Sequence, residues 1–495
     1  MERSQPTAGA TGMLTDLYQL TMACAYWRSG KSATDACFHL YFRSNPFGGG
    51  YALAAGLEQA AEYLRGLRFS DDDLRYLATL TGRDGGALFP TEFLAWLGEF
   101  RFTCDVLAVP EGTVVFPNEP LMRVTGPIAE CQLVETALLN IVNFQTLVAT
   151  KAARVCHAAD GQPVIEFGLR RAQGPDGGLS ASRAAYVGGC AGTSNVLAGQ
   201  RYGVPVGGTH AHSWVMAFDS ELESFLAYAE ALPNNGVLLV DTYDTIEGVA
   251  NAVRAGERFR ELGQDLIGIR IDSGDLAWLS RRAREMLDAA GFPDAKVYAS
   301  NELDEHTVES LKDQDAAIDV WGVGTRLVTA YDQPALGGVY KLSAIREPGG
   351  EWLHRVKVSE QTAKVTTPGL LRVRRYADAD GRFVGDMIYD EIAPPAEECV
   401  MVDPADATRR TSYCGMHGAT ELLVPVFERG ECVWEPPRLE DVRARTIAQL
   451  GALDPSHLRF LNPHVYKVGI ELGLHERKTA LILAARGLST QERRG

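Results

Sequence analysis

The sequence predicts an α/β protein built around an irregular β/α barrel, with an N-terminal α/β domain and an irregular C-terminal extension. Two observations predict this fold class. Between residues 160 and 345, short apolar segments alternate with amphipathic segments at intervals of about 20 to 30 residues, which is typical of parallel β/α units. The chain also has 495 residues, more than the roughly 250–300 that one hydrophobic core supports, so several domains are expected.

The N-terminal domain is predicted over residues 14–159, after a disordered arm at residues 1–13. Apolar residues at helical spacing predict its helices, and runs of apolar residues predict its strands. The expected elements are a helix at 14–30, a strand at 33–43, a glycine-rich loop at 44–56, short strands within 102–126 and a long helix at 131–159.

The barrel domain is predicted over residues 160–345, and its strands and helices alternate. The expected strands are 162–168, 203–210, 236–241, 265–272, 295–300 and 317–325, and the expected helices are 220–232, 245–263, 276–291 and 304–312. Right-handed crossovers and the number of units favour a barrel over an open sheet. A dinucleotide-binding fold has little support, because no Gly-x-Gly-x-x-Gly turn follows a first strand.

The C-terminal segment, residues 346–495, is predicted to be irregular and to pack back on the N-terminal domain. It is rich in proline, and residues 436–453 give it one clear helix. Four side chains of this segment could bind Zn²⁺, although their spacing is loose. They are Cys399, Cys414, His417 and Cys432.

Composition and charge exclude several function classes. Hydrophobic residues make up 46% and charged residues 23%, which is ordinary for a globular protein. The net charge of −16 disfavours binding to nucleic acid or to an anionic membrane, although local arginines can still bind a small anion. Nine scattered cysteines fit reduced thiols and a cytoplasmic location. We expect no signal peptide and no transmembrane helix, because no apolar run of the required length exists.

Polar residues gather where the predicted barrel strands end, which is where β/α folds carry their chemistry. Each segment taken singly could be a helix cap, since Asp, Ser and Thr are common caps. Six such segments in succession favour a ligand site. They are EFGLRR (166–171), GTHAHS (208–213), VDTYDT (240–245), RIDSGD (270–275), ASNE (299–302) and GVGTR (322–326).

Two of these segments have the chemistry of a ribose or phosphate site. In RIDSGD, Asp272 and Asp275 could bind ribose hydroxyls or Mg²⁺, and the N–H groups at the start of the following helix attract phosphate. In GVGTR, a glycine turn with its N–H donors and Arg326 could hold a phosphate ester.

The segment GGTHAHSWV (207–215) contains two histidines whose roles the residues alone leave open. His210 and His212 could hold a metal together with acids from later strands, as in a metal-dependent hydrolase. One of them could instead be a buried histidine bonded to the backbone. One could also be a nucleophile that accepts a phosphoryl group while a carboxylate, for which Asp241 is the candidate, holds the other nitrogen's proton. A sugar-phosphate binding protein without turnover is a further alternative.

Several segments resemble the nicotinate phosphoribosyltransferase family. They are TDLYQLTMA near the start, EFGLRRAQG, GGTHAHSWV, VDTYDT, IDSGDL and GVGTRLVTAYDQPALGGVYKL, in order from about residue 14 to 345, and LNPHVYKV at 461–468. The resemblance implies a type II phosphoribosyltransferase-like fold and a homodimer. It also implies that nicotinate and phosphoribosyl pyrophosphate form nicotinate mononucleotide, in a step of NAD salvage. ATP hydrolysis would drive this reaction through a phosphohistidine, with Mg²⁺ as cofactor.

By position, the resemblance implies three catalytic residues. His212 would be the phosphoryl acceptor, Asp241 would orient it, and Asp272 would hold ribose. His210 would be a neighbour of His212 and not a metal ligand. Asp272, with Asp275, would hold Mg²⁺.

The resemblance also implies a set of substrate-binding residues. Tyr18 and Phe167 would sandwich the pyridine ring, because flat aromatic rings gain by stacking, although each could instead belong to the core. The residues that would contact the carboxylate, ribose or phosphates are Arg170, Ser213, Arg270, Gly324 and Thr325.

Ser194 is expected to select the pyridine substrate. It lies in GGCAGTSNVLAG (188–199), where nicotinamide-using relatives carry an aspartate. A hydroxyl suits the anionic nicotinate, whereas an aspartate facing it would cost several kcal/mol in a partly dry pocket. The alternative is a loop residue that makes a local turn.

Overall fold

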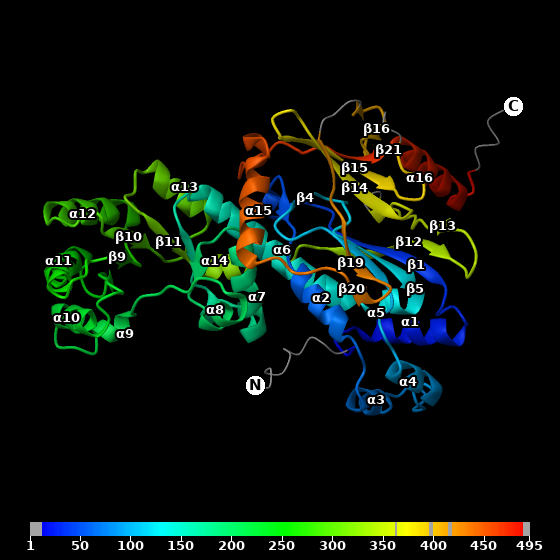
Figure 1. Ribbon diagram of the computed structural model, residues 1–495, viewed down its shortest axis with the longest axis horizontal. Coiled ribbons are helices and arrows are strands. Elements are labelled where there is room, and N and C mark those ends of the chain that lie inside the picture. The colour runs from blue at the N-terminus through cyan, green and yellow to red at the C-terminus, as the bar shows by residue number, and fades with distance from the viewer. Residues whose placement is uncertain (1–11, 362–363, 396–398, 414–417, 489–495) are drawn as a thin grey trace. The chain divides into compact units, whose positions relative to one another are not determined.

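The computed structural model describes residues 12–361, 364–395, 399–413 and 418–488 (Figure 1). Residues 1–11 of the predicted arm lie outside the described residues, as do Cys414 and His417 of the candidate zinc set. The chain divides into two compact units. The first unit contains Met1–Leu147, Ala335–Arg438 and Arg445–Gly495, and the second contains Val148–Pro334 and Leu439–Ala444.

A parallel sheet of six strands forms the centre of the second unit. Its strands are β6 (Val164–Glu166), β7 (Gly192–Thr193), β8 (Val237–Leu239), β9 (Gly268–Ile271), β10 (Lys296–Ala299) and β11 (Val320–Val323). Their spatial order is β7-β6-β11-β10-β9-β8, so β6 pairs with both the second strand and the last one. From β8 to β11 each strand pairs with the next in sequence, and β11 returns to β6, which is the strand order of a β/α barrel interrupted between β7 and β8. The predicted irregular β/α barrel is confirmed.

The ring is irregular because the strand predicted at 203–210 does not form. Val206 makes a single parallel bridge to Thr193. Gly203 ends helix α8 (Val196–Tyr202) in the left-handed region, with φ of 72°, and Pro205 has no N–H to donate to a ladder. At the edge of β8, the N–H of Leu239 donates to the imidazole of His210. A side chain therefore takes a place that a strand carbonyl would take in a regular barrel.

Helices follow the barrel strands as the sequence predicts. The predicted helices are α10 (Glu221–Ala231), α11 (Thr245–Glu261), α12 (Leu276–Ala289) and α13 (Glu305–Asp313). Apolar side chains of α11 and α12, including Phe259 and Leu287, share one buried core with Leu238 and Ile269 of the sheet. Further helices, which the sequence analysis did not identify, are α7 (Gly174–Val187), α8, the short α9 (His212–Val215) and α14 (Thr325–Val328), and the turn η2 (Leu169–Arg171).

The first unit contains an antiparallel sheet of seven strands in the order β13-β12-β1-β5-β3-β19-β20. These are β1 (Asp35–Tyr41), β3 (Asp105–Ala108), β5 (Met122–Pro127), β12 (Val339–Arg346), β13 (Leu353–His354), β19 (Val424–Glu428) and β20 (Glu431–Cys432). A two-stranded sheet joins β2 (Ala52–Leu53) to β4 (Val114–Val115). Because β19 pairs with β3, residues from the C-terminal segment extend the sheet of the N-terminal segment.

The helices of the first unit lie mostly in its N-terminal part. They are α1 (Leu17–Arg28), α2 (Leu57–Gly66), α3 (Asp71–Leu77), α4 (Thr91–Gly98), α5 (Ile128–Leu133) and the turn η1 (Pro46–Gly48). The helix predicted at 131–159 is two helices, since α5 ends at Leu133 and α6 (Glu135–Ala158) begins after Val134. In the glycine-rich loop, a Cβ on Gly50 would lie 2.3 Å from the carbonyl oxygen of His457, so this glycine permits a close backbone approach.

The C-terminal extension is present and is more regular than expected. It contains a second sheet in the order β17-β16-β21-β15-β14-β18. These strands are β14 (Leu371–Ala377), β15 (Phe383–Asp390), β16 (Val400–Val402), β17 (Arg410–Ser412), β18 (Gly418–Glu421) and β21 (Val468–Glu471), and the helices are α15 (Leu439–Gly451), η4 (Pro455–His457) and α16 (Leu472–Ala485). None of the described helices has the length and apolar character needed to cross a bilayer.

Candidate active site

The polar segments predicted at the strand ends lie at one rim of the barrel sheet. Because its strands run parallel, their carboxyl ends share this rim. Phe167 follows β6, Asp241 and Thr242 follow β8, Asp272 follows β9, and Gly324 follows β11. The second unit therefore gathers segments that are far apart in the sequence.

His210 is a buried residue with a structural role. Its Nε2 accepts a hydrogen bond from the N–H of Leu239 at 3.1 Å, and its Nδ1 lies 3.4 Å from the carbonyl oxygen of Ala211. Its ring packs edge-on against Tyr228. Burial lowers the pKa of His210 to about 4, so the ring is neutral near pH 7.

This environment removes the basis of the metal-dependent hydrolase alternative. The Nε2 lone pair of His210 is used by the backbone, so His210 and His212 do not offer two free nitrogens to one ion. Among the residues that the structure describes, no three His, Cys, Asp or Glu side chains are grouped as a metal site would require. The interpretation of His210 as a buried neighbour fits these contacts.

His212 is the first residue of α9, and its ring lies between two strand ends. Its Nδ1 is 3.1 Å from the hydroxyl oxygen of Thr242, and its Nε2 is 4.0 Å from Oδ2 of Asp272. When Nδ1–H donates to Thr242, Nε2 keeps its lone pair for an electrophile. The side chain is 41% exposed, so a ligand can reach this nitrogen.

Asp241 does not bond to the imidazole, as its predicted orienting role would require. Its Oδ2 accepts hydrogen bonds from the N–H of Asp272 at 2.9 Å and from the hydroxyl of Ser273 at 2.6 Å. The Nδ1 partner of His212 is instead Thr242, one residue further along. Asp241 therefore holds the turn that carries Asp272. Its Oδ1 is buried and has no hydrogen-bond partner within the described ranges, which leaves it available to a ligand.

Two guanidinium groups give the rim an anion-binding character. Nη2 of Arg270 donates to the carbonyl of His210 at 3.3 Å, while its buried Nε has no hydrogen-bond partner in the described part of the chain. Burial is the main cause that lowers the pKa of Arg270. The carboxylates of Asp272 and Asp241 raise it, and the charge of Arg170 lowers it. The charges of Arg170 and Arg270 therefore repel each other.

The residue that fixes the aromatic side of the rim is Glu166, which the sequence analysis did not identify. Its carboxylate is fully buried and accepts hydrogen bonds from the N–H of Gly168, from the hydroxyl of Ser182 at 2.7 Å and from the hydroxyl of Thr193 at 2.6 Å. Its carbonyl accepts a hydrogen bond from the N–H of Ser194 at 2.9 Å. One carboxylate thus joins the loop after β6 to α7 and to the loop after β7.

Phe167 lies between this network and the last strand. Its N–H donates to the carbonyl of Val323 at 2.8 Å, and its ring packs on Gly322, where an added Cβ would lie 2.7 Å from the ring. Phe167 is half-buried, so part of its ring remains open to a ligand. A glycine at 322 is what allows the ring to occupy this place.

The remaining predicted site residues have mixed surroundings. Arg170 and Ser213 are exposed, Ser194 and Thr325 are half-buried, and Tyr18 lies on α1 of the first unit with 49% exposure, so it is not a core residue.

Two predicted ligands are already engaged with protein groups. Asp275 caps α12, because its Oδ1 accepts a hydrogen bond from the N–H of Trp278 at 3.0 Å. Arg326 forms an ion pair with Asp304 at 2.6 Å, so its guanidinium is already paired.

Replacing Glu166 with Gln is expected to destabilise the second unit. The amide nitrogen of Gln is a donor, and it would face either the Gly168 N–H or the hydroxyl donors that Glu166 now accepts. A buried donor left without an acceptor costs about 1–3 kcal/mol. Urea denaturation should show a lower free energy of unfolding by about that amount, whereas the exposed Glu285→Gln change should have little effect. Equal stability of both variants would show that the network does not hold the rim.

The pKa of His210 predicts how stability depends on pH. Its pKa in the folded protein, about 4, lies below the ordinary value of 6.5, so between these pH values the unfolded chain binds a proton that the folded chain does not. Stability is therefore lost as the pH falls from 6.5 towards 4. Between pH 7 and pH 4.5, the His210→Gln variant should lose about 2–3 kcal/mol less free energy of unfolding than the parent protein. Urea denaturation at both pH values measures this difference. An identical loss in both proteins would contradict the assignment.

Comparison with known proteins identifies the family. Residues 13–143, 163–352 and 372–478 match the N-terminal domain, the family region and the C-terminal domain of nicotinate phosphoribosyltransferase. A nicotinate phosphoribosyltransferase of Bacillus subtilis is 46% identical over 460 residues, 92% of each chain, and one of Mycobacterium tuberculosis is 43% identical, over 90% of this chain and 88% of its own. The crystal structure of human nicotinic acid phosphoribosyltransferase superposes with a TM-score of 0.82 at 33% identity, covering 94% of this chain and 99% of its own. The chain therefore belongs to the nicotinate phosphoribosyltransferase family.

Proposed function

We propose that the protein transfers a phosphoribosyl group to nicotinate, forming nicotinate mononucleotide and pyrophosphate, and that ATP hydrolysis drives this reaction through a phosphohistidine at His212. The observation that carries the proposal is the position of His212 at the rim that also holds Arg270. Its Nε2 lies 4.0 Å from Oδ2 of Asp272 and has no hydrogen-bond partner among the described residues. The names of the related enzymes from Bacillus subtilis and human support the substrate assignment.

The phosphoribosyl transfer depends on positioning of the two substrates and on stabilisation of charge in the transition state more than on covalent catalysis. The pyridine nitrogen attacks C1 of the ribose as the bond from C1 to the pyrophosphate oxygen breaks. Phe167 would stack on the pyridine ring, and Arg170 and Arg270 would bind the carboxylate and phosphate charges. Asp272 would bind the ribose hydroxyls, with its carboxylate held by the hydroxyl of Ser300 and its N–H held by Asp241.

The phosphoryl transfer uses the free nitrogen of His212. Nε2 attacks the γ-phosphorus of ATP, an N–P bond forms, the bond to the bridging oxygen breaks and ADP leaves. The Nδ1 proton would remain directed at Thr242, which stabilises the positive ring. Water later cleaves the N–P bond and releases phosphate, so each turnover restores the imidazole.

Mg²⁺ is the cofactor we propose, and carboxylates of the rim fit it. Asp272 with the unpartnered Oδ1 of Asp241 would hold the ion, because Mg²⁺ binds through one or two carboxylates together with substrate phosphates. Asp275 is a poorer ligand than the sequence suggests, since its carboxylate caps α12. When bound, the ion would supply positive charge against the pyrophosphate.

We also propose a cytoplasmic homodimer, in which the exposed Tyr18 supplies the second ring against the pyridine. Gly324 and Thr325 would bind phosphate with the N–H groups at the start of α14, and Ser213 would donate to a phosphate beside His212. Size-exclusion chromatography with light scattering tests the dimer.

Replacing His212 with Ala is expected to remove the stimulation of synthesis by ATP. The variant lacks the nitrogen that accepts the phosphoryl group, while the groups that bind nicotinate and ribose remain. Formation of nicotinate mononucleotide should fall to one slow rate, the same with and without ATP. His306→Ala, on the exposed surface of α13, is the matched control and should keep the stimulation. Persistent ATP stimulation in His212→Ala would overturn the assignment.

Changing Ser194 to Asp is expected to weaken the use of nicotinate. An aspartate here would face the substrate carboxylate, and two like charges in a partly dry pocket cost several kcal/mol. Each 1.4 kcal/mol is a factor of about ten, so kcat/KM for nicotinate should fall on the order of 100-fold or more. Ser194→Ala, which removes the hydroxyl without adding charge, should fall much less. Comparable kcat/KM for nicotinate and nicotinamide in the parent enzyme would contradict this role of Ser194.

A further inference from the structure

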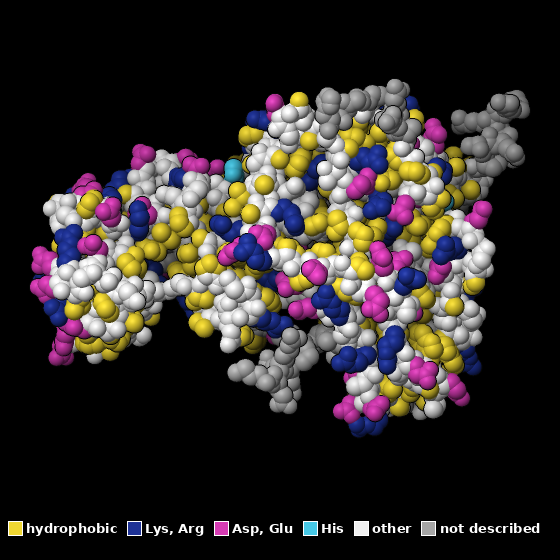
Figure 2. All heavy atoms as spheres, in the orientation of Figure 1, with side chains coloured by type: hydrophobic (Ala, Val, Ile, Leu, Met, Phe, Trp, Pro, Cys, Tyr) yellow, Lys and Arg dark blue, Asp and Glu magenta, His cyan; other side chains and the backbone are white. Residues whose placement is uncertain are grey.

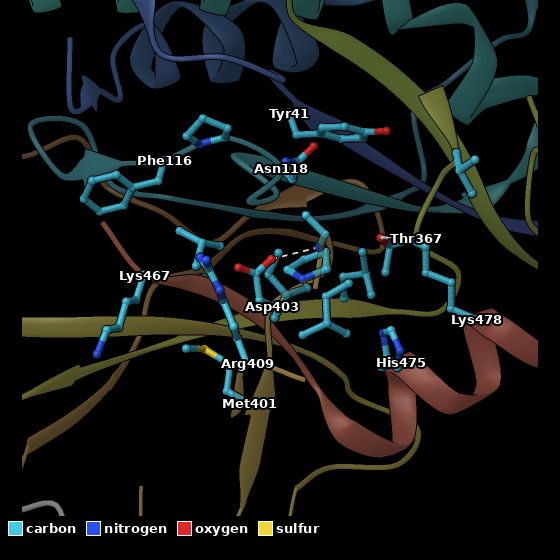
Figure 3. Close-up of a pocket in the computed structure, with 18 of the residues that line it drawn as sticks. Tyr41, Phe116, Asn118, Thr367, Met401, Asp403, Arg409, Lys467, His475 and Lys478 are labelled. Carbon is cyan, nitrogen blue, oxygen red and sulfur yellow. Dashed lines mark hydrogen bonds between the residues drawn. The ribbon is translucent and has the colours of Figure 1, made fainter. Parts of the chain in front are cut away.

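The first unit contains a large cavity that the proposed reaction does not use. Its volume is about 1250 Å³, and all of its lining residues belong to the first unit, whereas the rim that carries His212 belongs to the second. Tyr41, Phe116 and Asn118 line it on one side, and residues of the C-terminal sheet and α16 line the rest (Figure 3). The space is sufficient for a small organic ligand.

The charged side chains around this cavity are almost all positive. The cations are Lys341, Arg409, Arg410, Lys467, Lys478 and Arg486. One carboxylate, Asp403, is present among the lining residues, and its Oδ1 accepts a hydrogen bond from the N–H of Ala405 at 2.8 Å. Acidic and basic side chains are interspersed on the face shown in Figure 2, and the whole chain carries a net charge of −16. The lining of the cavity is therefore positively charged, although the chain as a whole is negatively charged.

Lys478 on α16 shows why an anion would be bound here. The side chain is half-buried, and burial lowers the pKa of its ammonium group. Its Nζ donates to the hydroxyl of Thr367 at 3.1 Å. No carboxylate lies within ion-pair distance of it in the described ranges of the chain. A partly dry ammonium without a counter-charge is unfavourable, and a bound anion would compensate it.

Further cations line the cavity and are exposed to solvent. Lys467, Arg410 and Arg486 are exposed, and none has an acidic ion-pair partner in the part of the chain that is described. Arg409 is paired with Asp406 at 3.4 Å. Figure 3 shows Arg409 and Lys467 on one side of the cavity and His475 and Lys478 on the other. Cations on two sides suit a ligand with separated negative charges better than a single small ion.

We propose that this cavity is a second ligand site, which binds a small organic phosphate carrying at least two negative charges, such as a nucleoside diphosphate. Phosphate oxygens would accept from the half-buried Lys478 and from the exposed Lys467. The proposal does not depend on the phosphoribosyl transfer, because the two sites share no residues.

Calorimetric titration with ADP tests the proposal in the full-length protein. The titration is made in an Arg270→Gln background, which weakens phosphate binding at the barrel rim. ADP should still bind in the cavity. Adding Lys478→Gln should weaken that binding by about tenfold or more, which is the effect of losing one charge-assisted contact. Lys478→Arg, which keeps the charge, should retain most of the affinity. Lys31→Gln, an exposed lysine of the same unit, should leave it unchanged.

Two outcomes would overturn the proposal. One is the absence of ADP binding in the Arg270→Gln protein. The other is an affinity that Lys478→Gln leaves unchanged while circular dichroism shows a folded chain. If Lys478→Gln does not fold, Lys467→Gln replaces it, because that side chain lines the cavity and is exposed. Failure of ADP to bind the cavity would not alter nicotinate mononucleotide synthesis, so the two proposals are tested separately.

Discussion

The carboxylate of Glu166 lies at the end of the first barrel strand and accepts three hydrogen bonds, from the Gly168 N–H and from the hydroxyls of Ser182 and Thr193. A buried carboxylate is stable only when such donors surround it, so these segments must keep their places relative to one another. The positions of Phe167 and of the loop that begins at Ser194 follow from this constraint. The aromatic half of the rim is therefore held by a polar network as well as by the packing of the Phe167 ring on Gly322.

The two histidines of the rim differ in their hydrogen-bond partners, because a backbone N–H donates to His210 and a threonine hydroxyl lies beside His212. His210 gives its Nε2 lone pair to the N–H of Leu239, where the irregular barrel lacks a strand, and burial keeps it neutral. His212, two residues later, starts a helix, and within the described ranges its Nε2 accepts no hydrogen bond and lies beside Asp272. The irregularity of the barrel thus has a chemical consequence, since it uses one imidazole for structure and leaves the other for a ligand.

Much of the fold could be predicted from local sequence patterns, because the barrel strands and helices have clear periods. The strand predicted at 203–210 failed because Gly203 and Pro205 interrupt an otherwise apolar run. The C-terminal sheet was missed because its strands, such as β14 and β18, find their partners through long-range pairing that no local period reveals.

The sequence indicates which residues follow the strands, but it does not indicate which partners those residues contact. His212 and Asp272 could be found from their place after strands. The role of Glu166 depends on Ser182 and Thr193, which lie 16 and 27 residues away. The segment EFGLRR therefore does not by itself reveal that Glu166 is the acceptor of a buried hydrogen-bond network. Asp241 was assigned the bond that Thr242 makes, because adjacent residues at a strand end cannot be distinguished without the turn geometry.

³¹P NMR of the protein after incubation with ATP and Mg²⁺ tests whether Nε2 of His212 carries the phosphoryl group. We expect one acid-labile phosphohistidine signal with the chemical shift of an Nε2 phosphoramidate. It should be absent from His212→Ala and should disappear when nicotinate and phosphoribosyl pyrophosphate are added. An Nδ1 signal, a signal that survives in His212→Ala, or no signal in a protein whose synthesis ATP still accelerates would contradict the claim.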